Sequence, residues 1–195
     1  GSAALDTFVK ATSKKMSLLT ISSLLALLLV GRAAANCAEG VNDTTFKLAV
    51  DMWLDSETRS DAETMYGGSI RTWNTSCITS FKDLFRGSFN FSEDLSLWQT
   101  SNVVDMSYMF YQSEDFGADI SSFDVSKVTN MDYAFAETVN FKPWDQIQGW
   151  TTTSVQSMMY TFQSAGWALG QLQQQVTLCW DLDSIDEDNI KMVSC

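Results

Sequence analysis

The chain has 195 residues, a formal net charge of −12 at pH 7 and no histidine. Such an acidic surface repels phosphates, so we expect no nucleic-acid partner. Without histidine the chain offers no Ser-His-Asp or Cys-His relay and no imidazole ligand for zinc, and we expect neither a metal site nor a cofactor. Apolar residues make up 45% of the chain, enough to bury a core.

Residues 1–35 predict a secretory signal peptide with a possible upstream extension. Lys14 and Lys15 precede an apolar run over residues 18–30, and Ala33 and Ala35 are the small residues of a cleavage site. The run is shorter than the roughly 20 residues that span a bilayer, so we favour cleavage and a secreted or cell-surface protein. An uncleaved signal anchor is the alternative, and only then do we expect membrane attachment.

Residues 36–72 predict an N-terminal helical cap made of two helices. Helix-starting residue types at 43–45 come directly before an apolar stripe, which consists of Phe46, Ala49, Val50 and Trp53. Ser60 and Glu63 match a capping box, and Gly67-Gly68 matches a helix stop. We expect this hairpin to lie over the first repeat.

A repeat of about 25 residues occupies residues 73–166, with units near 73–97, 98–122, 123–149 and 150–166. A phenylalanine recurs once per unit, at Phe85, Phe110, Phe135 and Phe162. A branched aliphatic recurs at Ile78, Val103, Val128 and Val155, and a small residue at Ser88, Ser113, Thr138 and Ala165. Such self-similarity predicts a solenoid, in which each unit buries its apolar face against its neighbours.

Within a unit, the spacing of Val103, Met106 and Phe110 predicts one face of a short helix. Residues 119–123 leave room for only a brief strand. The predicted fold class is therefore an α/β solenoid, a leucine-rich-repeat-like array of about four to five short strand-helix units with an N-terminal helical cap. We expect the repeated methionines and aromatic residues to form its core.

The segments 98–110, 116–123 and 124–131 carry a family resemblance. Their sequences, WQTSNVVDMSYMF, FGADISSF and DVSKVTNM, closely resemble the repeat of the BspA-like leucine-rich-repeat surface proteins, also described as a mycoplasma-type lipoprotein repeat. The resemblance implies an exported repeat domain used for attachment and recognition. It supplies no catalytic residues.

Residues 167–195 predict a degenerate last repeat and a C-terminal cap, because Trp180 and Ile185 restart the pattern of the earlier units. The acidic run over residues 181–189 is rich in oxygen ligands for calcium. It departs from an EF-hand loop at Ile185, where a ligand is needed, and at Asp186, where glycine is needed. We favour a solvated, charged edge.

The sequence contains four cysteines and three N-glycosylation sequons. The cysteines, at Cys37, Cys77, Cys179 and Cys195, indicate two disulfides in an oxidising compartment. Three pairings are possible, and we favour Cys37 with Cys77 and Cys179 with Cys195. The sequons place glycan acceptors at Asn42, Asn74 and Asn90.

Outward-facing polar positions recur in register, with Asp94 beside Asp119 and Ser96 beside Ser121. These four residues predict a binding surface for an extracellular protein or polysaccharide on a non-enzymatic recognition or adhesion domain. The same rows also fit a purely solubilising surface. A structural coat or spacer is the alternative function, and a carboxylate-dependent glycoside hydrolase is less favoured, because hydrolysis needs two carboxyls across a cleft.

Overall fold

The computed structural model describes residues 41–141, 146–147 and 149–166. The chain divides into two compact units, Gly1–Asn74 and Thr75–Cys195. The predicted signal segment 1–35 and the predicted last repeat and acidic run, 167–195, lie outside the described residues and stay predictions. Over the described ranges, no helix combines the length and the apolar character that crossing a membrane requires.

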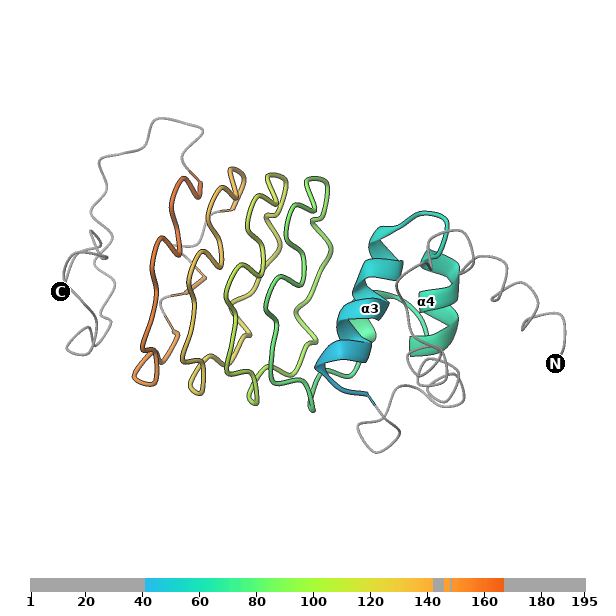
Figure 1. Ribbon diagram of the computed structural model, residues 1–195, viewed down its shortest axis with the longest axis horizontal. Coiled ribbons are helices and arrows are strands. Elements are labelled where there is room, and N and C mark those ends of the chain that lie inside the picture. The colour runs from blue at the N-terminus through green and yellow to red at the C-terminus, as the bar shows by residue number, and fades with distance from the viewer. Residues whose placement is uncertain (1–40, 142–145, 148, 167–195) are drawn as a thin grey trace, which may run out of the picture. The chain divides into compact units, whose positions relative to one another are not determined.

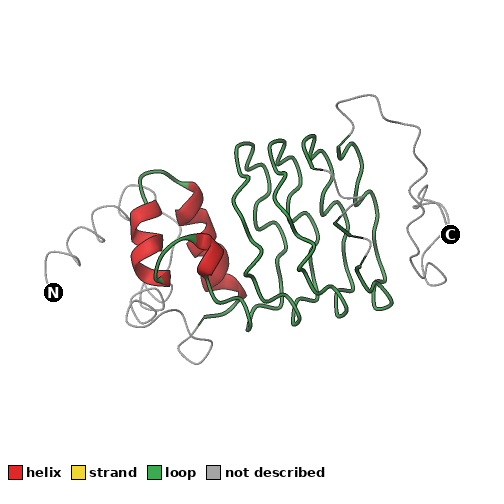
Figure 2. Cartoon of the chain, turned by 180° about the vertical axis from the view of Figure 1, so that it is seen from behind, coloured by secondary structure: helices red, strands yellow, loops and turns green. Residues whose placement is uncertain are grey.

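The first unit contains the two helices expected from its sequence (Figure 2). They are α3, Asp43–Leu54, and α4, Arg59–Tyr66, followed by the 3₁₀ helix η2, Ile70–Thr72. Helix α3 starts after Asn42, whose side chain accepts hydrogen bonds from the backbone N–H groups of Thr44 and Thr45. Helix α4 ends at Gly67, which adopts a left-handed conformation with φ 78°.

The capping box predicted at Ser60 and Glu63 is wrong. Helix α4 begins at Arg59, after Thr58, and no side chain caps its N-terminus. The capping box belongs to α3 instead, where the N–H of Asn42 donates to Oγ1 of Thr45 over 2.9 Å.

Aromatic side chains hold the first unit together. The ring of Trp73 stacks on Tyr66 with centroids 4.5 Å apart, and it meets Phe46 and Trp53 edge-on at 6.0 and 5.6 Å. The indole N–H of Trp73 donates to the carbonyl oxygen of Gly68 over 3.0 Å. Burial raises the pKa of Tyr66 to about 12, so its hydroxyl stays protonated in the folded protein.

The second unit corrects the predicted fold class. Its described residues form no helix, strand or sheet, so the repeat is neither an α/β solenoid of strand-helix units nor a leucine-rich-repeat-like array. Each repeat is instead an irregular coil, and successive coils stack on one another (Figure 1). Isolated parallel bridges connect one residue of each coil, Ser80, Asp105, Asn130 and Ser157, and we number the coils first to fourth by these residues.

Backbone hydrogen bonds between coils replace the predicted helix. In the second coil every second N–H group donates to a carbonyl oxygen of the third coil, at distances of 2.8 to 3.0 Å. The donors are Met106, Tyr108, Phe110 and Gln112, and the acceptors are Asn130, Asp132, Ala134 and Ala136. In an α-helix these groups would bond four residues back along the same segment. The ladder recurs from the first to the second coil and from the third to the fourth.

Left-handed residues make this ladder possible. Tyr108 and Gln112 have φ of 58° and 60°, and their counterparts in the third coil, Tyr133 and Glu137, have 54° and 61°. Between ladder bonds the chain forms tight turns, as where the N–H of Met109 bonds to Met106 O. A left-handed conformation costs a non-glycine residue about 1 to 2 kcal/mol. The hydrogen bonds to the next coil offset this cost.

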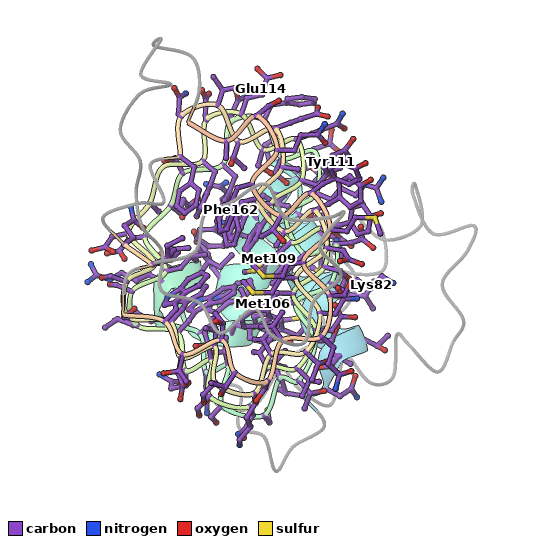
Figure 3. The ribbon with its side chains drawn as sticks, turned by 90° about the vertical axis from the view of Figure 1, so that its left-hand side faces the viewer. Lys82, Met106, Met109, Tyr111, Glu114 and Phe162 are labelled. Atoms are coloured by element: carbon purple, nitrogen blue, oxygen red, sulfur yellow. The ribbon has the colours of Figure 1, made fainter. Side chains whose placement is uncertain are left out.

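The interior of the coils is the predicted core. The recurring phenylalanines at position 110 and its counterparts form a column in which successive ring centroids lie 5.2, 5.6 and 5.4 Å apart. A second column, Phe91, Phe116 and Phe141, packs against the first, with Phe110 and Phe116 only 3.7 Å apart. Met106, Met109 and Phe162 lie inside the coils in Figure 3. The core prediction is thus confirmed.

Buried threonines join neighbouring coils. Oγ1 of Thr100 accepts a hydrogen bond from the N–H of Asp124 over 2.7 Å and donates to the Asp124 carbonyl oxygen over 3.1 Å. Thr75 makes the same pair of bonds with Gln99. The corresponding residue of the third coil is Val125, which cannot form them. Two of the junctions are therefore fixed by a hydroxyl that both donates and accepts.

Replacing Thr100 with valine is expected to lower the free energy of unfolding by about 1 to 3 kcal/mol, because the N–H of Asp124 loses its acceptor inside the protein. Urea titration of the full chain measures this change. The same substitution at Thr153, which is exposed, is the control and should shift the value by less than about 0.5 kcal/mol. Equal effects of the two substitutions would contradict the structural role of the Thr100 hydroxyl.

Candidate functional site: a tyrosine strip across the coils

The most distinctive surface feature of the second unit is a row of aromatic side chains. Tyr108, Tyr133 and Tyr160 occupy the same position in the second, third and fourth coils, and all three have positive φ. Centroids of neighbouring rings lie 4.9 and 5.1 Å apart, with planes 8° and 40° apart. We call this row, together with Arg86, Tyr111 and Glu137, the tyrosine strip.

Arg86 closes one end of the tyrosine strip. Its guanidinium carbon lies 5.0 Å from the centroid of the Tyr108 ring and 5.2 Å from that of Tyr111, within the range of a cation–π interaction. The two rings meet edge to face at 88°. Nη1 of Arg86 also donates to Oδ1 of Asp83 over 3.0 Å. The guanidinium is thus held by two rings and one carboxylate.

Carboxylates flank the strip farther along the stack. Oε1 of Glu137 accepts a hydrogen bond from the hydroxyl of Tyr111 over 3.3 Å, and Oε2 accepts from the side-chain amide of Gln112 over 3.0 Å. Asp132 accepts hydrogen bonds from the hydroxyl of Ser157 and, over 2.7 Å, from the N–H of Met159. These bonds connect the second, third and fourth coils and hold both carboxylates in fixed positions.

Two tyrosines of the strip, Tyr111 and Tyr133, remain neutral. Desolvation raises the pKa of Tyr111, and the nearby charge of Glu137 raises it further. Desolvation also raises the pKa of Tyr133, with smaller contributions from the neighbouring tyrosines and Asp132. Their hydroxyls are therefore hydrogen-bond donors throughout the physiological pH range.

The strip is suited to binding. Tyr160 is 48% exposed, and Met159 beside it is 36% exposed, so an apolar surface is open to solvent at the fourth coil. Tyr111 and Lys82 both point outward on the same side of the coils in Figure 3, while Glu114 lies at another edge. In the described part of the chain, no group of three His, Cys, Asp or Glu side chains could hold a metal ion.

The tyrosine strip is not among the sites predicted from the sequence. The repeated spacing predicts the buried face of a helix, and that prediction covers only the core columns. The signal was nevertheless present, because the tyrosines recur two residues after the methionines of the core, at Met106, Met131 and Met158. A large side chain that repeats beside a core column, without belonging to it, indicates a surface row.

The predicted binding residues lie in turns at the surface. The N–H of Ser96 donates to Oδ1 of Asp94 over 2.8 Å, and the N–H of Ser121 donates to Oδ1 of Asp119 over the same distance. Hydrogen bonds from Ser121 lower the pKa of Asp119, while the charge of Asp94 opposes this shift. The two carboxylates therefore lie close enough to repel each other, and each also stabilises its own turn.

The predicted disulfides and glycan acceptors fall partly outside the described residues. No disulfide is seen between described residues, among which Cys77 is the one cysteine and is not a free thiol. Cys37, Cys179 and Cys195 lie outside them. Of the sequon asparagines, Asn90 is exposed, Asn74 is partly buried and Asn42 caps helix α3. Glycosylation of all three stays a prediction.

The turn aspartates generate a prediction about acid stability. Hydrogen bonds from Ser126 lower the pKa of Asp124, as those from Ser121 do for Asp119. A carboxyl with a lowered folded-state pKa stabilises the fold above its unfolded pKa, and this contribution is lost as the pH falls through the folded value. Below about pH 4 we therefore expect the melting temperature of the chain to fall.

The double substitution Asp119→Asn and Asp124→Asn should reduce this acid sensitivity, because asparagine retains the turn acceptor but does not titrate in this range. Melting curves between about pH 6 and pH 2 measure the effect. A double variant that lost as much stability as the wild type over this range would contradict the assigned role of the two carboxylates.

Comparison with known proteins gives one family. A family model described as "Mycoplasma protein of unknown function, DUF285" matches residues 55–177, more than half of the chain. Neither the curated proteins nor the solved structures gave a match. The mycoplasma-type part of the resemblance seen in the sequence is confirmed, and nothing supports its BspA-like leucine-rich-repeat part. The chain belongs to the family described as Mycoplasma protein of unknown function, DUF285.

Proposed function

We propose that the second unit is a non-enzymatic recognition module of a secreted or cell-surface protein, and that it binds a protein or glycan partner through the tyrosine strip. The observation that carries this proposal is the register of Tyr108, Tyr133 and Tyr160, whose rings recur at about 5 Å along the surface. Tyrosine is enriched at binding sites because it buries a large, rigid apolar surface and still offers a hydroxyl.

The rigidity of the strip supports the same function. The Tyr108 and Tyr133 N–H groups donate to carbonyl oxygens of the next coil, and the rings stack on one another. Tyr111 is fixed through its hydroxyl bond to Glu137. A surface whose side chains are already ordered loses little conformational entropy when it binds, which favours affinity.

The aspartate rows predicted from the sequence are less suited to be the main contact. Asp94 and Asp119 each accept a hydrogen bond from the backbone two residues later, so both serve in their own turns. Small polar side chains on a turn also bury less apolar surface than an aromatic ring. We therefore place the binding surface at the tyrosine strip.

Binding to panels of extracellular proteins and glycans, with the full chain as probe, tests this function. Tyr133→Ala and Tyr160→Ala should each weaken the binding of a ligand found in this way by about tenfold or more, as expected for an aromatic side chain that contributes over about 1.4 kcal/mol to an interface. Tyr160→Phe should largely keep the affinity, because it retains the ring.

Leu97→Ala is the matched control, because Leu97 is also exposed and apolar, at 49%, and is not a member of the strip. Melting curves confirm that each variant is folded. Binding that survives both tyrosine substitutions, or that Leu97→Ala weakens equally, would place recognition elsewhere on the molecule. Concentration-dependent sedimentation of the chain without any ligand would instead favour the coat or spacer function.

A further inference from the structure

The tyrosine strip is divided by charge along the stack. The first coil contributes Lys82, Arg86 and the Asp83 that pairs with Arg86, whereas the third coil contributes Asp132 and Glu137. Within the described ranges no lysine or arginine forms an ion pair with Asp132 or Glu137. The third and fourth coils thus combine tyrosine rings with carboxylates that no positive charge of the described chain neutralises.

The first and second coils show which chemical group fits such a surface. There the guanidinium of Arg86 lies over the Tyr108 and Tyr111 rings and bonds to a carboxylate of Asp83. A planar guanidinium is suited to this arrangement, because it stacks on aromatic faces while its N–H groups bond to carboxylate oxygens. Arg86 therefore shows, within the chain itself, which type of side chain fits a surface of tyrosine rings and a carboxylate.

Tyrosine rings and a carboxylate also occur together in the third and fourth coils, but there without a cation of the described chain. Tyr133 and Tyr160 are 5.1 Å apart with planes tilted by 40°, and Tyr160 is the most exposed tyrosine of the strip. The carboxylate of Asp132 lies near these rings: its charge acts on Tyr133, and its Oδ1 accepts a hydrogen bond from the N–H of Met159, the residue before Tyr160. The chain has a net charge of −12, so its field attracts cationic partners and repels anionic ones.

We propose that Tyr133, Tyr160 and Asp132 form a binding site for an arginine side chain of a partner protein. The proposal rests on the recognition function assigned to the tyrosine strip, and it specifies the partner as a protein with an exposed basic segment. Arginine is preferred over lysine, because the compact ammonium group of lysine is more strongly hydrated and cannot stack as a plane. The charge of Glu137, beside Tyr111, adds to the attraction.

Fluorescence anisotropy with the full chain and two labelled peptides, an oligoarginine and an oligolysine of equal length, tests the arginine site. The oligoarginine should bind more tightly, by about threefold to tenfold, which corresponds to a cation–π contact of about 0.7 to 1.4 kcal/mol. Tyr160→Ala and Asp132→Asn should each weaken oligoarginine binding by a similar factor and reduce the preference over oligolysine. Tyr160→Phe should retain both.

Asp119→Asn is the matched control, because it removes one exposed carboxylate that has no tyrosine beside it, and it should change the affinity by less than about twofold. Equal affinities for the two peptides, or an equal loss with Asp119→Asn, would overturn the arginine site. Ligands of the panel that lose binding with Tyr133→Ala, while oligoarginine fails to bind, would also overturn it but leave the proposed function intact. If a glycan is among the ligands that lose binding in this way, the partner of the tyrosine strip is a glycan and not a protein.

Discussion

The hydrogen bonds from every second N–H group of one coil to the carbonyl oxygens of the next determine the structure of the repeat. They direct the polar groups of the backbone along the stack. In a helix these groups would be satisfied within one segment, and in strands they would be satisfied within a sheet. Because these bonds use only backbone atoms, they tolerate very different side chains at one position, such as Asp83 in the first coil and Tyr108 in the second. The side chains are thereby free to differ between coils.

The ladder also explains how core and surface are kept in register. Each coil repeats the backbone path of its neighbour, so a phenylalanine that points inward lies over the phenylalanine of the next coil, as Phe85 does over Phe110. The same translation places Tyr108 over Tyr133 on the outside. Stacked aromatic columns inside and outside therefore have one common cause, although only the outer column is available to a partner.

The sequence was sufficient to predict which residues are buried but not the backbone that buries them. Recurrence of Phe110 and Val103 at equal spacing identified the core, because burial depends on position within the repeat rather than on the type of secondary structure. The spacing of Met106 and Phe110 fits both a helix and a pair of four-residue turns, and the left-handed conformation of Tyr108 is not visible in its residue type. Hydrogen bonds between coils, which decide between the two, join residues about 25 positions apart.

The candidate site was harder to predict than the core. The regularly spaced aspartates predicted a binding surface because recurring charge is easily recognised in a sequence. In the structure, Asp94 and Asp119 each accept a hydrogen bond from their own turn. The tyrosines are partly exposed, and a tyrosine in an apolar repeat resembles a core residue. Their position on the surface becomes visible only in the structure, where Tyr108 and Tyr133 have positive φ.

The equal spacing of the coils also relates the number of repeats to the size of the proposed ligand. One additional repeat of the second-coil type would extend the outer column by one tyrosine and about 5 Å, without changing the contacts of the coils already present. Proteins built from different numbers of these coils would then bind partner segments of correspondingly different length. Affinity could evolve by duplication of whole units rather than by substitution within a fixed site.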